Sequence, residues 1–94
     1  MSLQKKYVLI TGVSTGIGND AVGYLIDNGY HVLGSVRKEE DKVRLEQQYP
    51  NNFTCLQFDV TKLDEVKSAF TKVERILKGN KLIGLVNNAG LALQ

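Results

Sequence analysis

The stretch YVLITGVSTGIGND, residues 7–20, contains a short run of β-forming residues, a turn with closely spaced glycines, and the start of a helical pattern. A turn from a strand into a helix presents unpaired backbone N–H groups and the positive end of a helix dipole. A pyrophosphate binds well to both, and glycine lets its oxygens come close to the main chain. We therefore interpret the loop around Gly12, Gly16 and Gly18 as a phosphate-binding turn.

The spacing of the glycines indicates which kind of loop this is. Residues 11–18 read T-G-x-x-x-G-I-G, which differs from the common G-x-G-x-x-G pattern, and no Gly-Lys-Ser/Thr follows as in a P-loop. Ser14 and Thr15 add hydroxyl donors, and Gly18 would let the helix pack closely on the sheet. The alternative is a structural turn that binds no ligand, which the flanking strand and helix make less favourable.

Short β-type runs alternate with helical patterns along the chain. The predicted strands cover residues 7–11, 30–36, 53–60 and 81–90, the last running into a turn. The predicted helices cover residues 17–29, 38–49 and 61–79. This βαβαβαβ order predicts an α/β fold, the N-terminal half of a Rossmann-type doubly wound parallel sheet with strand order 3-2-1-4. Ligands bind such sheets at the carboxyl ends of the strands where the order reverses, here between the first and fourth strands.

Two of the helices have apolar faces that predict how they pack. In the first, Ile17, Ala21 and Leu25 are spaced to lie on one face. The third carries an apolar stripe of Leu63, Val66, Phe70, Val73 and Leu77. Thr61 is a good N-cap for this third helix, and Gly79 is a plausible stop. We expect two helices on one face of the sheet and one on the other.

Composition favours a single small globular domain, residues 1–94. Hydrophobic residues make up 43% of the chain, and the net charge is +2 with acids and bases mixed. This argues against a nucleic-acid partner, and the short apolar runs argue against a membrane span or signal peptide. The single cysteine, Cys55, has no metal ligands at a recognisable spacing, so we expect a small core residue in a cytoplasmic protein. We expect His31 to be an ordinary strand residue.

The end of the second strand predicts which nucleotide binds. NAD-binding domains carry an acid there for the ribose 2′-hydroxyl. Here Val36 occupies that position and Arg37 and Lys38 follow, and a guanidinium suits a 2′-phosphate. We therefore expect NADP, with NAD less favoured; the alternative is that both bases are a solvated helix start. Asp59, an acid ending an apolar strand, is either a ligand-side group or a cap for the next helix.

Three separated segments resemble the short-chain dehydrogenase/reductase family: TGVSTGIG at residues 11–18, DVT at 59–61 and NNAG at 87–90. Their order, spacing and strand context agree with that family, and the resemblance covers essentially the whole chain. It implies an NADP-dependent oxidoreductase that transfers hydride between nicotinamide and a small-molecule carbonyl or alcohol substrate. At full length we expect a homo-oligomer.

The resemblance also implies a role for each matching residue. The glycine loop would hold the pyrophosphate, and Asp59 would contact the adenine amino group, with the Val60 backbone beside it. Arg37 resembles the residue that binds the 2′-phosphate in the family, with Ser14 as a helper. Three residues would line the adenosine ribose side and brace the strand: Asn87, Ala89 and Gly90. The implied cofactor-binding residues are Gly12, Ser14, Thr15, Gly16, Ile17, Gly18, Arg37, Asp59, Val60, Asn87, Ala89 and Gly90.

None of the tyrosines fits the family's catalytic pattern, in which a lysine follows four residues later and a serine and an asparagine lie upstream. The tyrosines are Tyr7, Tyr24, Tyr30 and Tyr49, and the residues four positions on are Thr11, Asn28, Gly34 and Phe53. We therefore predict no catalytic residue and no metal site here. The chain would be the cofactor-binding half of a longer enzyme and inactive alone.

Three alternatives stay open. The fourth strand would lie inside the sheet of a complete fold, but no later segment of this chain pairs with its far edge, which is an aggregation hazard. A naturally short protein that pairs with itself or a partner along that edge is one alternative. A non-catalytic dinucleotide-binding or interaction module is the second, and a methyltransferase-type Rossmann domain is the third.

Overall fold

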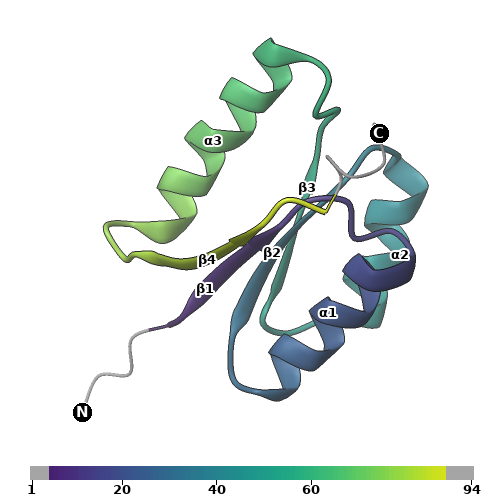
Figure 1. Cartoon of the computed structure of the whole chain (residues 1–94), viewed down its shortest axis with the longest axis vertical. Coiled ribbons are helices and arrows are strands. Elements are labelled where there is room, and N and C mark those ends of the chain that lie inside the picture. The colour runs from purple at the N-terminus through teal and green to yellow at the C-terminus, as the bar shows by residue number, and fades with distance from the viewer. Residues whose placement is uncertain (1–4, 89–94) are drawn as a thin grey trace.

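The computed structural model describes residues 5–88, in which strands and helices alternate in the predicted order (Figure 1). The strands are β1 (Tyr7–Ile10), β2 (His31–Val36), β3 (Phe53–Gln57) and β4 (Leu82–Val86). The helices are α1 (Gly16–Asp27), α2 (Glu39–Gln48) and α3 (Leu63–Leu77). The third strand ends before the predicted residue 60, because the backbone turns at Asp59, whose carbonyl accepts from the N–H of Lys62 at 3.0 Å.

The strands of the described residues are all parallel and lie in the order β3-β2-β1-β4, which confirms the predicted topology. Ile10 at the end of β1 pairs with Gly34 of β2 and with Val86 of β4. The pairing continues beyond β1, since the N–H of Thr11 donates to the carbonyl of Val86 at 3.0 Å. The loops that follow β1, β2 and β4 therefore leave the sheet along the same edge.

Side chains of the sheet alternate between two apolar layers, as the two-residue period of a strand requires. One layer joins Val8, Ile10 and Val32 to Val22 of α1 and Leu45 of α2. The opposite layer joins strand residues to α3: Tyr7, Leu9, Leu33, Leu56, Phe58, Ala69 and Val73. Two helices thus cover one face and α3 covers the other, as predicted (Figure 1).

The predicted packing face of α1 is wrong at Ile17, which is 81% exposed. The helix is instead buried at Gly18 and Val22, and Ala21 and Leu25 pack partly against the same layer. Successive helical residues turn by about 100°, so a face centred on Val22 leaves Ile17 pointing to solvent. The close approach of Gly18 to the loop before it sets this rotation.

The predicted stripe of α3 is wrong in part, because Leu63 and Phe70 are 67% and 53% exposed. The residues that pack on the sheet are Val66, Ala69, Val73, Ile76 and Leu77. A stripe through the small Ala69 has the same helical period as one through Phe70, and it lets the helix lie closer to the strands. The predicted N-cap is also wrong, since Lys62 precedes the helix as its cap residue and Thr61 bonds to Asp59 instead.

β4 lies at one edge of the sheet within the described residues and pairs there only with β1. Three of its large apolar residues are exposed to solvent: Ile83, Leu85 and Val86 are 53%, 59% and 45% exposed. This matches the expected apolar edge. Within residues 5–88, none of the helices combines the length and the apolar character that a membrane crossing requires.

Candidate cofactor-binding site

The loop between β1 and α1 requires glycine at two positions because of its backbone conformation. Gly12 and Gly16 have φ angles of 71° and 65°, in the left-handed region that side chains disfavour. Gly18 is needed for a different reason, since a Cβ there would overlap the carbonyl oxygen of Gly12 and lie 2.8 Å from Nδ2 of Asn88. The glycine spacing therefore follows from the shape of the loop as well as from any ligand.

The first amides of this loop are already bound to the sheet. The N–H of Gly12 donates to Oγ of Ser35 at 3.0 Å, and the N–H of Val13 donates to the carbonyl of Ser35 at 2.9 Å. The N–H groups of Gly12 and Val13 are therefore not among the unpaired amides that the sequence analysis expects of this turn. The first turn of α1 supplies further amide donors for an anion, because no helical carbonyl can reach them. The cap residue Thr15 makes no side-chain capping hydrogen bond within the described part of the chain.

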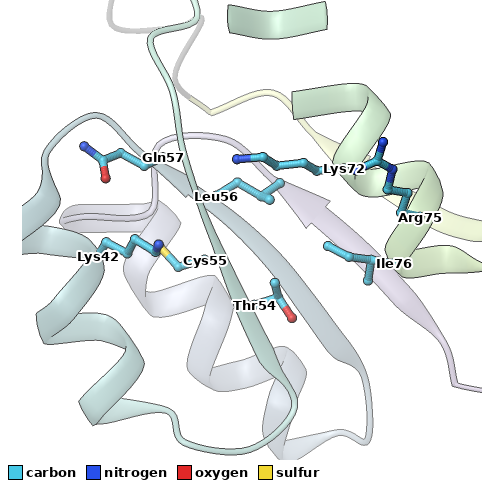
Figure 2. A pocket seen from close by; sticks show the side chains of 8 residues that line it. All are labelled: Lys42, Thr54, Cys55, Leu56, Gln57, Lys72, Arg75 and Ile76. Atoms are coloured by element: carbon cyan, nitrogen blue, oxygen red, sulfur yellow. The ribbon is translucent and has the colours of Figure 1, made fainter. Parts of the chain in front are cut away.

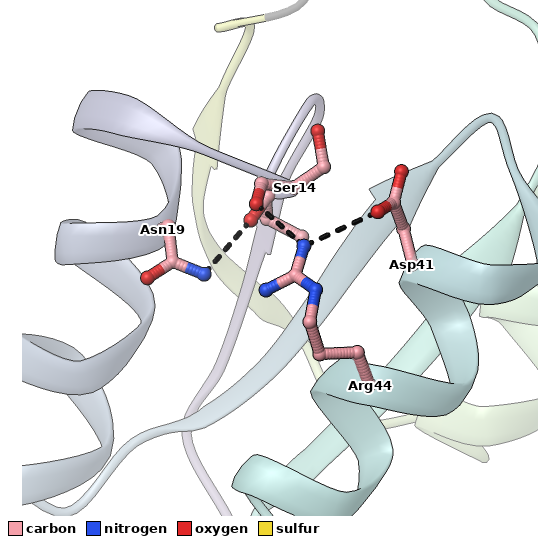
Figure 3. A network of polar contacts seen from close by, with 5 residues as sticks. Ser14, Asn19, Asp41 and Arg44 are labelled. Carbon is pink, nitrogen blue, oxygen red and sulfur yellow. Dashed lines mark hydrogen bonds and ion pairs between the residues drawn. The ribbon is translucent and has the colours of Figure 1, made fainter.

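Side chains from α1, from α2 and from the segment after β4 hold successive carbonyls of the loop. Nδ2 of Asn88 donates to Gly12 at 2.7 Å. Nδ2 of Asn19 donates to Val13 at 3.3 Å. Nη2 of Arg44 in α2 donates to Ser14 at 2.8 Å (Figure 3). These bonds fix the orientation of the peptide planes between β1 and α1.

A cleft of about 730 Å³ lies where the loops after the strands meet. Its walls are formed by Gly12, Ser14, Thr15, Ser35, Val36, Arg37, Lys38, Asp41, Phe58, Asp59, Val60, Thr61 and Asn88. Cofactor and ligand sites typically have volumes of about 300–1,000 Å³ and lie at this switch point of parallel sheets. The cleft is therefore the candidate site.

The structure brings half of the predicted cofactor residues together in this cleft: Gly12, Ser14, Thr15, Arg37, Asp59 and Val60. Gly16 and Ile17 are exposed at the start of α1, and Gly18 is buried behind the loop, so these three do not line the cleft. Ala89 and Gly90 lie outside the described residues.

Asn87 does not line the cleft either. Its Oδ1 accepts from Oγ1 of Thr11 at 3.2 Å, so it joins the ends of β1 and β4. The neighbouring Asn88 lines the cleft instead, because consecutive side chains of an extended segment point to opposite sides. The predicted roles of Asn87 stay predictions, and the sequence analysis did not include Asn88, which lines the cleft, among the cofactor-binding residues.

Sequence reasoning also missed Ser35 and Arg44. Ser35 is 2% exposed and is a buried polar residue among the apolar residues of β2 that follow His31. A lone hydroxyl in an apolar strand next to the glycine loop was a usable signal, since buried hydroxyls need partners. Arg44 carried no such signal, because its contact with Ser14 depends on how α2 lies against the loop.

The cleft contains two bases and two acids. Arg37 and Lys38 are exposed at the end of β2, and Asp41 and Asp59 lie on the walls around them. The hydroxyl and the N–H of Thr61 donate to Oδ1 of Asp59 at 2.7 and 2.9 Å. These bonds, and then Arg37 nearby, lower the pKa of Asp59 below its usual value, so its carboxylate is charged at neutral pH.

A second cleft, of about 460 Å³, lies along the outer side of β3 between α2 and α3 (Figure 2). It is lined by Lys42, Thr54, Cys55, Leu56, Gln57, Lys72, Arg75 and Ile76. Burial raises the pKa of the Cys55 thiol to about 11, with a smaller contribution from Glu46. This cysteine is a buried core residue, as predicted, and the cleft contains no part of the glycine loop.

Comparison with known proteins decides the family. The profile of the short chain dehydrogenase family matches residues 6–94. The chain belongs to the short-chain dehydrogenase family.

Several proteins that resemble this chain carry NADP or NADPH in their names. An NADPH-dependent 3-dehydrocapnine reductase from Ornithobacterium rhinotracheale is 41% identical over 87 residues, which are 93% of this chain and 31% of that protein. A Dichelobacter nodosus protein named "Probable NADP-dependent dehydrogenase in aabA 3'region" is 39% identical, over 92% of this chain and 79% of that one. The structure of ElxO with NADP bound matches with a TM-score of 0.77 at 34% identity, over 89% of this chain and 34% of that one. The chain thus spans about a third of the reductase and of ElxO.

Proposed function

We propose that this chain is the NADP(H)-binding part of a short-chain dehydrogenase that transfers hydride between nicotinamide and a carbonyl or alcohol substrate. The observation that carries the proposal is a single cleft in which the glycine loop meets Arg37 and Lys38 at the end of β2. Family membership supports an oxidoreductase, and the names of the NADPH- and NADP-dependent relatives support this choice of nucleotide.

The donor groups of the site fit a dinucleotide. The N-terminus of α1 suits the pyrophosphate at the point where its uncapped N-cap residue, Thr15, lines the cleft, since the helix amides and the helix dipole both favour an anion. Arg37 and Lys38 suit the 2′-phosphate, with the Ser14 hydroxyl as a further donor. Val36 stands where an NAD-binding domain has an acid, so no carboxylate at that position opposes the phosphate.

The adenine end of the nucleotide would lie against the loop after β3. Asp59 Oδ1 is occupied by Thr61, and the N–H of Asp59 donates to Oε1 of Glu65 at 2.9 Å. These contacts hold the carboxylate in place while its second oxygen remains available to accept from the adenine amino group. The Val60 backbone forms the adjoining wall.

Hydride transfer is the chemistry that the nicotinamide supplies when the cofactor is bound. The residues of this chain hold and orient the nucleotide and provide no tyrosine–lysine pair to move the accompanying proton. We propose that those groups lie outside residues 1–94, so that the chain alone binds nucleotide without turnover.

The test compares NADPH, NADH and S-adenosylmethionine by calorimetry on the complete protein encoded by the reading frame. We expect NADPH to bind at least about tenfold more tightly than NADH, and Arg37→Gln to remove most of that ratio. Arg75→Gln makes the same charge change on α3 and should leave the ratio unchanged. Equal binding of NADPH and NADH would refute the choice of cofactor. Preference for S-adenosylmethionine, or binding without any reductase activity of the complete protein, would refute the proposed enzyme.

A further inference from the structure

Arg44 of α2 joins two acceptor groups beside the cleft through one nitrogen atom (Figure 3). Nη2 donates to the carbonyl oxygen of Ser14 at 2.8 Å and to Oδ1 of Asp41 at 3.2 Å. Ser14 and Asp41 line the cleft, whereas Arg44 does not. The guanidinium therefore acts on the cleft wall without forming part of it.

Asp41 places a negative charge in the corner of the cleft that also contains Arg37 and Lys38. Its side chain is 25% exposed, so water screens that charge only in part. An uncompensated carboxylate there would repel a phosphate dianion, and a carbonyl oxygen turned into the cleft would add to the repulsion. Arg44 compensates the carboxylate and keeps the carbonyl of Ser14 directed toward α2.

A purely stabilising role explains this arrangement poorly. Arg44 and Asp41 are three residues apart on one helix, and the arginine side chain is 48% exposed, so the ion pair alone contributes little to stability. The hydrogen bond from Arg44 to Ser14, thirty positions earlier in the chain, is not needed to form the helix. Of the three side chains that hold successive carbonyls of the glycine loop, Arg44 alone is charged.

We propose that Arg44 is a positioning residue that sets the preference for a 2′-phosphorylated nucleotide. It acts by keeping Asp41 and the Ser14 carbonyl from opposing the phosphate beside Arg37 and Lys38. This inference rests on the proposed function, since it concerns the same site and the same nucleotide. Arg44 itself touches no part of the nucleotide.

The test is a double-mutant cycle on the complete protein, read as the ratio of the Kd for NADH to the Kd for NADPH at low ionic strength. The variants are Arg44→Met, Asp41→Asn and the double substitution, with Arg75→Met on α3 as the matched loss of one positive charge. Arg44→Met should lower the ratio about fivefold, because it exposes the carboxylate. In the double variant the ratio of the two Kd values should lie within about twofold of that of the unmodified protein, because the exposed carboxylate charge has been removed. Asp41→Asn alone and Arg75→Met should not lower the ratio.

The outcomes separate this inference from the proposed function. If the unmodified protein shows no preference for NADPH, the cofactor choice fails and the role of Arg44 fails with it. If the preference exists but Arg44→Met weakens both nucleotides equally, Arg44 is only a structural residue and the inference alone is overturned. Should Arg44→Met not fold, Arg44→Lys decides. Arg44→Lys keeps the positive charge, so the ratio of the two Kd values should stay within about twofold of the unmodified protein while both nucleotides bind more weakly. A fivefold fall in this ratio would contradict charge compensation.

Discussion

The Nδ2 atom of Asn88 donates to the carbonyl oxygen of Gly12 at 2.7 Å, joining residues that are 76 positions apart in the chain. The same nitrogen is one of the atoms nearest to Gly18, where a Cβ would lie 2.8 Å from it. The segment after β4, the start of the glycine loop and the first turn of α1 therefore meet at one point. The shape of the loop depends on all three.

Asn88→Ala should destabilise the fold and weaken nucleotide binding. It removes the donor that orients the Gly12 carbonyl, and loss of one such bond costs about 1 kcal/mol in the free energy of unfolding. Urea denaturation and NADPH titration measure the two effects. Asn51→Ala, in the exposed turn between α2 and β3, is the control and should change neither. Unchanged stability and affinity in Asn88→Ala would show that the contact does not matter.

Gly18→Ala and Gly23→Ala, both in α1, should have opposite effects. The first pushes a methyl group into the Gly12 carbonyl and should lower the free energy of unfolding by about 1–3 kcal/mol. The second meets only the end of the Tyr49 side chain, 3.2 Å away, and alanine is the better helix former by about 1 kcal/mol. Thermal unfolding of both variants distinguishes them, and equal stabilities would contradict the close approach at Gly18.

His31 should make the fold less stable in mild acid. Its Nε2 lies 2.9 Å from Oγ1 of Thr54, and Nδ1 is buried with no hydrogen-bond partner among residues 5–88. Burial, and then the nearby Lys5, lower the pKa of His31 below its usual 6.5. The unfolded chain therefore binds this proton more tightly than the folded chain does. The contribution to stability is present above pH 6.5 and is lost as the pH falls toward the lowered pKa.

The measurement for His31 is the free energy of unfolding in urea at about pH 7.5 and about pH 5.5, on either side of the histidine range. The unmodified protein should lose stability between the two, and His31→Gln, which cannot titrate, should lose less. The chain has no other histidine, so the difference between the two proteins reports this residue. Identical pH dependence in both would exclude the assignment.

Cys55 should react slowly in the folded protein. Its pKa is raised to about 11, chiefly by burial, and the thiolate is the form that attacks alkylating reagents. At about pH 8, iodoacetamide should modify the folded chain at least about 100-fold more slowly than the same chain in concentrated urea. Mass spectrometry over time gives both rates. A folded-state rate close to the urea rate would mean that the thiol is accessible and ionised.

The topology was predictable because it depends on the alternation of strand and helix patterns along the chain. Apolar strand segments alternating with helices allow few arrangements, and the right-handed crossover selects among them. Helix rotation was not predictable at Ile17 and Phe70. Each lies about 100° from a packed neighbour, so the periodicity alone fits two adjacent faces. The small residues Gly18 and Ala69 decide which face is buried, because they allow the closer approach.

The candidate site was predictable where it depends on strand ends. Arg37 and Asp59 follow β2 and β3, and parallel strands bring such residues to one edge whatever the detailed packing. The contacts that shape the loop were not predictable in the same way. Arg44 and Asn88 reach the loop from 30 and 76 positions away, and only the assembled sheet and helices bring them there.

Ser35 connects β2, the strand whose end would select the nucleotide, with the turn between β1 and α1. Its Oγ accepts a hydrogen bond from the N–H of Gly12 at 3.0 Å and so supports the turn. A change of the proposed cofactor preference to NADH would alter the end of β2, where Val36 and Arg37 line the cleft. In this chain such a change must keep a hydroxyl at position 35 while it exchanges Val36 and Arg37. A swap that brings in an aliphatic residue there would leave an amide without its acceptor and damage pyrophosphate recognition together with the intended change.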